Sequence, residues 1–257
     1  MPAAHAQHLS DLGVHDACGL LALVRSRGLR RPISPTKAMT VHILDTLRLR
    51  GIVEVPWPAA RWELPPRGFL TPIEQLSWDF VWSTMQLEGL VPHLEDLLRE
   101  YSHAPSSQDE LIAVWRALIR AECVEYFEFQ LTKHGFEPAW SADLDWLPAH
   151  YLDDLSLVQW KYLIWSAVRH GAMECLRSRF NPQQTRNAIA SMLASSHRLG
   201  YALGGNFEGF RPRSLHPYSL MGESMLFFAS QLGSLYWTEP PNELALLRTS
   251  KTGATGG

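Results

Sequence analysis

Apolar residues along most of the chain recur at the three- and four-residue spacing of an amphipathic helix. Between Ser34 and Gly51, for example, Met39, Ile43 and Leu47 repeat every four positions, with a capping hydroxyl before them and a glycine stop after them. Such spacing gathers the apolar side chains on one helix face. The same signals predict helices over residues 16–28, 34–50, from 71 onward, 92–101, 107–134, 156–178, 181–203, 218–236 and 242–248.

One segment departs from this pattern. Residues 52–55 alternate β-branched and polar side chains, residues 62–64 can pair with them, and prolines stand on both sides. These features indicate a short hairpin. The expected fold class is therefore mainly α, with a small N-terminal domain at 1–70, a larger multi-helix body at 71–248, and a disordered tail at 249–257.

Composition places the chain among ordinary globular proteins. Apolar residues make up 46% and charged residues 19% of its 257 residues, which is enough to build a sizeable core. The three cysteines lie far apart, which argues against both a disulfide framework and a zinc site. No apolar run approaches the roughly 20 residues of a membrane span, and no secretory signal is expected. We expect a cytoplasmic protein that uses no metal or other cofactor and does not enter a membrane.

Charge is distributed unevenly along the chain. Residues 1–70 hold nine Lys/Arg and five Asp/Glu, a net +4, whereas the remainder holds 14 and 21, a net −7. A basic domain followed by an acidic body indicates two parts with different partners.

The basic domain carries a recognisable order of elements. A helix over residues 34–50 ends in Leu47-x-x-x-Gly51 and is followed at once by the β-branched segment 52–55. This order resembles the winged-helix family over about residues 16–66. The resemblance implies that helix 34–50 lies in a DNA major groove, although such domains also serve as protein-binding or purely structural modules. The residues it assigns to bases or phosphates are Arg30, Arg31, Thr36, Lys37, Thr40 and Arg61.

Motifs for catalysis are weak. Glu122, Glu125 and Glu128 recur every three residues, so the first and last diverge by about 120° around a helix and cannot all serve one site. We expect one or two to be solvated and one to be partly buried against an arginine. His170 and Glu174 are four apart on one helix face. No nucleophile elbow, P-loop, dinucleotide fingerprint or His-Glu-x-x-His motif is present, so no catalytic residue is predicted.

The irregular segment 204–217 combines aromatic and arginine side chains, which suit a protein interface or an RNA strand. The partner-binding residues predicted there are Phe207, Phe210, Arg211, Arg213 and His216. The resulting hypothesis is a non-enzymatic regulatory or interaction protein that contacts nucleic acid through its N-terminal domain and binds a protein through its helical body. The alternative is a toxin-neutralising (immunity-type) protein, which the acidic body without catalytic motifs also fits. An enzyme with a carboxylate and histidine site is the third hypothesis.

If residues 1–70 form a working winged helix, this fragment is expected to bind duplex DNA weakly and in a salt-dependent way. Neutralising about 3 phosphates gives a slope of roughly −2.7 for log affinity against log salt concentration. Fluorescence anisotropy titrations at two salt concentrations measure the slope. No binding at low salt would remove the DNA hypothesis.

Overall fold

The computed structural model describes residues 9, 11–29, 31–54, 78–82, 84–146, 154–202 and 216–252. Over this part the chain is mainly helical, as predicted, with one two-stranded sheet. Packing divides it into two compact units, and the sequence had predicted a domain boundary near residue 70. Unit 1 comprises Met1–Val114, His216–Gln231 and Thr249–Gly257, and unit 2 comprises Trp115–Leu215 and Leu232–Arg248.

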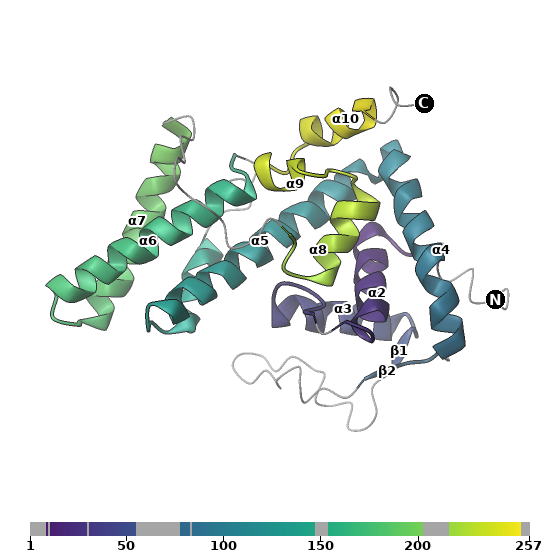
Figure 1. The fold of residues 1–257 in the computed structure, drawn as a ribbon, viewed down its shortest axis with the longest axis horizontal. Coiled ribbons are helices and arrows are strands. Elements are labelled where there is room, and N and C mark those ends of the chain that lie inside the picture. The colour runs from purple at the N-terminus through teal and green to yellow at the C-terminus, as the bar shows by residue number, and fades with distance from the viewer. Residues whose placement is uncertain are drawn as a thin grey trace. The chain divides into compact units, whose positions relative to one another are not determined.

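Unit 1 is built around one buried helix, α2 (Val14–Ser26). Its other elements are α3 (Lys37–Leu49), β1 (Val53–Glu54), β2 (Asp79–Phe80), α4 (Thr84–His103), η3 (Pro105–Ser107), the first turns of α5 (Gln108–Lys133), α8 (Leu220–Ser224) and the π-helical turn η6 (Met225–Ala229). Helix α2 packs against α3, α4, α8 and η6 (Figure 1). It is buried almost all the way round, which explains its nearly continuous apolar sequence.

A left-handed glycine ends α3 and directs the chain into β1. Gly51 has φ +69°, and its N–H donates to the Arg48 carbonyl at 2.9 Å. The next N–H, that of Ile52, donates to the Leu47 carbonyl at 2.9 Å. These two bonds form a Schellman motif, in which a glycine satisfies the last helix carbonyls without steric cost.

The strand that pairs with β1 comes from an unexpected place. Val53 lies opposite Phe80 in an antiparallel pair, so Asp79–Phe80 is a strand where the sequence predicted a helix. Residues 55–77, including the predicted strand 62–64 and the start of the predicted helix at 71, lie outside the described part of the chain. The winged-helix assignment therefore stays a prediction.

One predicted helix boundary is corrected by capping. Helix α3 begins two residues later than predicted, with Thr36 as its N-cap where Ser34 was predicted, because the Thr36 side chain accepts the hydrogen bond from the Met39 N–H at 3.3 Å. Ser34 is buried, with its hydroxyl 2.7 Å from that of Thr40.

Helix α4 also differs, since it runs unbroken through Pro92, where the sequence predicted a new helix. Proline removes one backbone hydrogen bond. The apolar face of the helix nevertheless continues past Pro92, and the packing of this face keeps the helix unbroken. The buried residues of this apolar face are Leu87, Leu90, Leu94 and Leu98.

The helix predicted over residues 218–236 is interrupted. Helix α8 and η6 end before Gln231 and Gly233, which have φ +52° and +55°. The chain resumes as α9 (Leu235–Thr238). Two left-handed residues so close together are incompatible with one continuous helix.

Unit 2 contains the rest of α5, η4 (Pro138–Trp146), α6 (Leu157–Arg177), α7 (Pro182–Ala202), α9 and most of α10 (Glu243–Thr252). Helices α6 and α7 lie side by side as a hairpin (Figure 1). They approach closely at Gly171, where any added Cβ would meet the Ile189 side chain. Helix α6 lies where a helix was predicted, and it begins with a capping box formed by Ser156 and Gln159. Helix α10 continues to Thr252, into the stretch predicted to be disordered, and residues 253–257 lie outside the described part.

Within the described residues, none of the helices is both long enough and apolar enough to cross a membrane.

A polar network fixes the N-terminal end of α2. The Asp16 carboxylate is buried, with one oxygen 3.2 Å from His15 Nδ1 and the other 2.8 Å from Arg50 Nε. The hydrogen bond from His15 and the charge of Arg50 lower the pKa of the Asp16 carboxyl, although burial alone would raise it. The ionised carboxylate therefore stabilises the folded state.

We predict that Asp16→Asn lowers the free energy of unfolding by about 1.5–3 kcal/mol at pH 7, since a buried hydrogen-bonded charge is lost. Because the folded-state pKa is the lower one, this contribution is complete above an unfolded-state pKa of about 3.9 and is lost as pH falls through the folded value. Urea unfolding of both proteins at pH 7 and pH 3 tests this. Asp45→Asn, in an exposed pair with Arg48, is the control with little expected effect. A difference between wild type and Asp16→Asn that is unchanged at pH 3 would contradict the role of the charge.

Candidate ligand pocket

Three of the residues predicted to contact nucleic acid hold unit 1 together. The Arg31 guanidinium pairs with the Glu223 carboxylate and donates to the Pro217 carbonyl at 2.9 Å. Thr36 caps α3, and Thr40 is buried. These three side chains therefore have structural roles that leave little of their polar surface for a phosphate.

The other predicted contact residues are placed only in part. Lys37 is exposed in the first turn of α3, whereas Arg30 and Arg61 lie outside the described residues. Of the predicted partner-binding residues, His216 is exposed. The remaining four, Phe207, Phe210, Arg211 and Arg213, lie outside the described part of the chain.

The three glutamates of α5 have three different environments, as their angular spacing predicts. Glu122 is fully buried, Glu125 is half-buried, and Glu128 is exposed and accepts a hydrogen bond from Ser141 Oγ at 3.0 Å. The partner of Glu122 is Lys161 on α6 and not an arginine, with 2.8 Å between Nζ and Oε2. His170 is half-buried on α6, and no hydrogen bond or ion pair described for it leads to these glutamates.

Lys161 is held by more than its ion pair. Its ammonium lies 5.4 Å from the ring centre of Trp237 and 5.8 Å from that of Tyr126. The side chain of Lys161 is only 9% exposed and that of Glu122 is 0% exposed. Unit 2 thus holds an ammonium group between one carboxylate and two aromatic rings, deep in its core. This arrangement joins α5 to α6.

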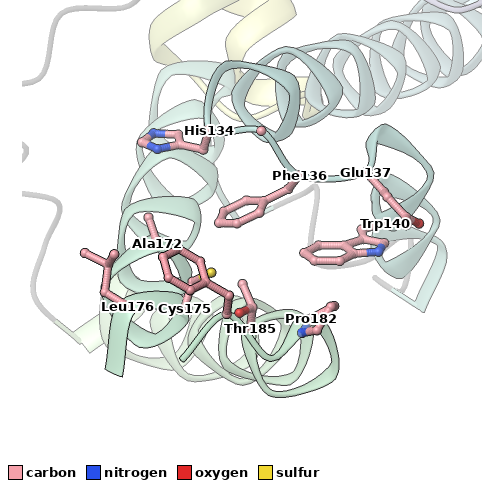
Figure 2. Close-up of a pocket in the computed structure, with 11 residues that line it drawn as sticks. His134, Phe136, Glu137, Trp140, Ala172, Cys175, Leu176, Pro182 and Thr185 are labelled. Atoms are coloured by element: carbon pink, nitrogen blue, oxygen red, sulfur yellow. The ribbon is translucent and has the colours of Figure 1, made fainter. Parts of the chain in front are cut away.

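A cavity in the described part of unit 2 lies at the C-terminal ends of these same two helices. Its volume is about 540 Å³, within the range of ligand pockets. Figure 2 shows one wall from the end of α5 and the start of η4, facing the turn between α6 and α7. The lining residues are His134, Gly135, Phe136, Glu137, Trp140, Ala172, Cys175, Leu176, Phe180, Pro182 and Thr185.

The first wall is a column of three aromatic rings. Gly135, with φ +74°, ends α5, and the Phe136 N–H donates to the Leu131 carbonyl at 2.9 Å. The Phe136 ring stacks on His134 at 6.3 Å and on Trp140 at 5.5 Å, with interplanar angles of 18° and 19°. The Schellman turn at the end of α5 therefore places the Phe136 ring in the pocket wall.

The second wall uses the same turn without a glycine. The Phe180 N–H donates to the Cys175 carbonyl at 2.8 Å, as at the end of α5. Here the left-handed residues are Arg179, with φ +55°, and Phe180 itself, with φ +66°. Left-handed backbone at non-glycine residues costs on the order of 1–3 kcal/mol each. Burial of the ring does not offset this cost, because Phe180 remains 71% exposed.

Exposed apolar side chains continue from this turn along α6. Leu176, in the lining, is 68% exposed, and Met173, one helical turn earlier, is 52% exposed. Together with Phe180 they form an apolar patch at the mouth of the pocket. Contiguous exposed apolar surface marks interaction sites more often than isolated exposed residues do.

Few polar groups line the pocket. Glu137 supplies a carboxylate, and Thr185 Oγ1 donates to the Asn181 carbonyl at 2.9 Å. Burial, followed by the charges of Lys133 and Arg169, lowers the pKa of His134, so this imidazole is uncharged at neutral pH. Apart from Glu137, the lining is therefore neutral and largely apolar.

Cys175 gives the pocket a chemical reporter. The other two thiols are fully buried, and desolvation raises the pKa of Cys123 to about 12 and that of Cys18 still further. Cys175 is half-exposed in the lining. A small alkylating reagent is therefore expected to react first at Cys175, and an occupant of the pocket should slow that reaction.

None of the pocket residues was predicted from the sequence. The sequence carried only a weak signal. A phenylalanine follows the end of each of two predicted helices: Phe136 follows the helix at 107–134, and Phe180 follows the helix at 156–178. Nothing in the spacing shows that the two ends face each other. In the described part of the chain, no group of three or more His, Cys, Asp or Glu side chains is arranged to hold a metal ion.

We predict that Glu122→Gln lowers the free energy of unfolding by roughly 3–5 kcal/mol, because it leaves the Lys161 ammonium buried without its carboxylate. Adding Lys161→Met to Glu122→Gln removes the unpaired charge and should recover part of the loss. Glu125→Gln is the control on the same helix. Urea denaturation measures all three variants, and equal stability of Glu122→Gln and wild type would contradict the buried pair.

Comparison with known proteins leaves the pocket to be interpreted from its own residues. No protein-family model, no curated protein and no solved structure matches this chain.

Proposed function

We propose that this chain is a non-enzymatic interaction protein, and that the pocket of unit 2 holds an aromatic side chain from a segment of a partner protein. The observation that carries the proposal is Phe180, a bulky residue in left-handed backbone whose ring stays exposed at the mouth of an apolar pocket. Backbone strain of this kind concentrates at functional sites.

Comparison with the other helix ends supports a role beyond folding. The same turn is made with Gly51 after α3 and with Gly135 after α5, where glycine adopts the left-handed conformation freely. At the end of α6 the chain has Arg179 and Phe180 instead. Glycine at either position would stabilise the turn, so stability alone does not account for the phenylalanine.

The shape and chemistry of the pocket favour an aromatic anchor. Its lining includes three aromatic residues, Phe136, Trp140 and Phe180. Aromatic pairs gain about 0.5–1.5 kcal/mol beyond area burial. Residues that dominate binding energy are enriched in Trp, Tyr and Arg and sit in well-packed pockets.

Contact with DNA through the N-terminal domain is the second candidate function. It is supported by the net +4 charge of residues 1–70 and by the exposure of Lys37 at the start of α3. The structural roles of Arg31, Thr36 and Thr40 weigh against it. The salt-dependence measurement on residues 1–70 tests this candidate separately from the pocket.

We predict opposite effects of Phe180→Gly on stability and on binding. The variant relieves the left-handed strain, so its free energy of unfolding should equal that of wild type or exceed it by up to ~1 kcal/mol. It removes one wall of the pocket, so occupancy should be lost. Arg179→Gly is the matched control, since it relieves strain at the neighbouring residue and leaves every lining side chain in place.

Occupancy is measured by protection of Cys175. The full-length protein is treated with iodoacetamide, an uncharged reagent, in rising concentrations of N-acetyltryptophan amide, and alkylation of Cys175 is followed by mass spectrometry. Wild type and Arg179→Gly should both be protected, and Phe180→Gly should not. The proposal fails if the compound does not slow alkylation of the wild type, or if Phe180→Gly is protected equally well.

A further inference from the structure

We infer that the pocket selects a basic aromatic segment, in which the aromatic anchor is followed by a lysine or arginine that lies against Glu137 and Trp140. This inference rests on the proposed function, because it names the chemistry of the segment that the pocket would hold. It concerns the charge of the partner, which the apolar walls alone do not specify.

The position of Glu137 provides the first argument. Glu137 is exposed and supplies the acidic side chain among the lining residues. In Figure 2 the side chains of Glu137 and Trp140 both lie on the η4 side of the cavity. The turn that carries both is compact, with the Trp140 N–H donating to the Glu137 carbonyl at 3.1 Å. A carboxylate next to an indole attracts a cation through both its charge and the ring quadrupole.

The same unit already holds one cation in this manner. Lys161 lies between the Glu122 carboxylate and the rings of Trp237 and Tyr126. The internal site combines a carboxylate with aromatic rings, and Glu137 and Trp140 provide the same two kinds of group at the pocket. The difference is that Glu137 is exposed, so a cation there would keep most of its hydration and gain a smaller, salt-sensitive stabilisation.

Basic side chains stand outside the lining, although Lys133 and Arg169 are close enough to lower the pKa of His134. The Arg169 guanidinium lies 4.6 Å over the Trp165 ring, and Arg177 pairs with Glu174 at 4.0 Å. The remaining basic side chains around it are Lys133 on α5, Arg179 on the α6–α7 turn and Arg186 on α7, and they lie outside the lining. His134 is uncharged at neutral pH, so it does not oppose a cation in the pocket.

Three peptides separate the charge from the aromatic anchor: acetyl-Trp-Lys-amide, acetyl-Trp-Gln-amide and acetyl-Trp-Glu-amide. Each is titrated against the full-length protein, and the concentration that halves the rate of Cys175 alkylation by iodoacetamide is recorded. Wild type should need about three- to tenfold less of the lysine peptide than of the glutamine peptide, given one exposed ion pair and one cation–π contact. The glutamate peptide should be the weakest, and 1 M salt should reduce the preference for lysine.

Glu137→Gln should lower the ratio between the lysine and glutamine peptides, because only the cation–π contact with Trp140 remains, without changing the concentration needed for the glutamine peptide. Glu174→Gln is the matched control, since it removes a nearby α6 carboxylate that does not line the pocket, and it should keep the wild-type ratio. Because the ratio is taken within each variant, a change in thiol reactivity cancels.

The outcomes distinguish the two proposals. Equal protection of wild type by the lysine and glutamine peptides, or stronger protection by the glutamate peptide, would overturn the inference and leave the aromatic pocket intact. A lysine preference in Glu137→Gln that equals that of wild type would also overturn it. If no peptide protects Cys175, the proposed function itself fails.

Discussion

The buried pairing of Glu122 with Lys161 is the interaction on which the candidate site depends. It joins α5 to α6, and the C-terminal ends of these two helices form the two walls of the pocket. The pair is almost completely removed from water, and the rings of Tyr126 and Trp237 cover the ammonium. A buried charge pair adds little net stability compared with apolar packing, but breaking it is costly. The pair therefore restricts how the two helices can lie against each other within unit 2.

The C-terminal ends of α5 and α6 determine which side chains line the pocket. Both end in a turn in which a phenylalanine N–H donates to the carbonyl five residues earlier, and both phenylalanines line the cavity. At α5 the turn uses a glycine and the ring joins a stacked column. At α6 it uses Arg179, and the Phe180 ring stays exposed. One wall is thus relaxed and packed, whereas the other is strained and exposed to solvent.

In unit 1, arginines of the basic N-terminal segment form ion pairs that stabilise the fold. Arg31 pairs with Glu223, Arg50 pairs with Asp16, and Arg25 pairs with Glu95 at 2.5 Å. Each of these carboxylates is largely buried, so the arginines hold segments of unit 1 to one another. The positive charge counted along residues 1–70 is therefore partly neutralised by acidic residues that are adjacent only in the folded chain.

The sequence by itself determined the class of fold and most helix ends, because capping and apolar periodicity are local properties. Ser156 and Ser178 mark the ends of α6, and Gly135 follows α5, as predicted. The prediction failed where longer-range packing competed with a local signal. The leucine face of α4 continues through Pro92, and Phe80 pairs with Val53 in place of joining a helix. The angular spacing of Glu122, Glu125 and Glu128 correctly indicated that the three carboxylates do not share one site, but the expected arginine partner was wrong. Only the tertiary structure decided that Lys161 is the partner of Glu122, and that Phe136 and Phe180, 44 positions apart, face one cavity. The spacing of residues along a chain fixes the direction of a side chain on its own helix, but not which other helix it meets.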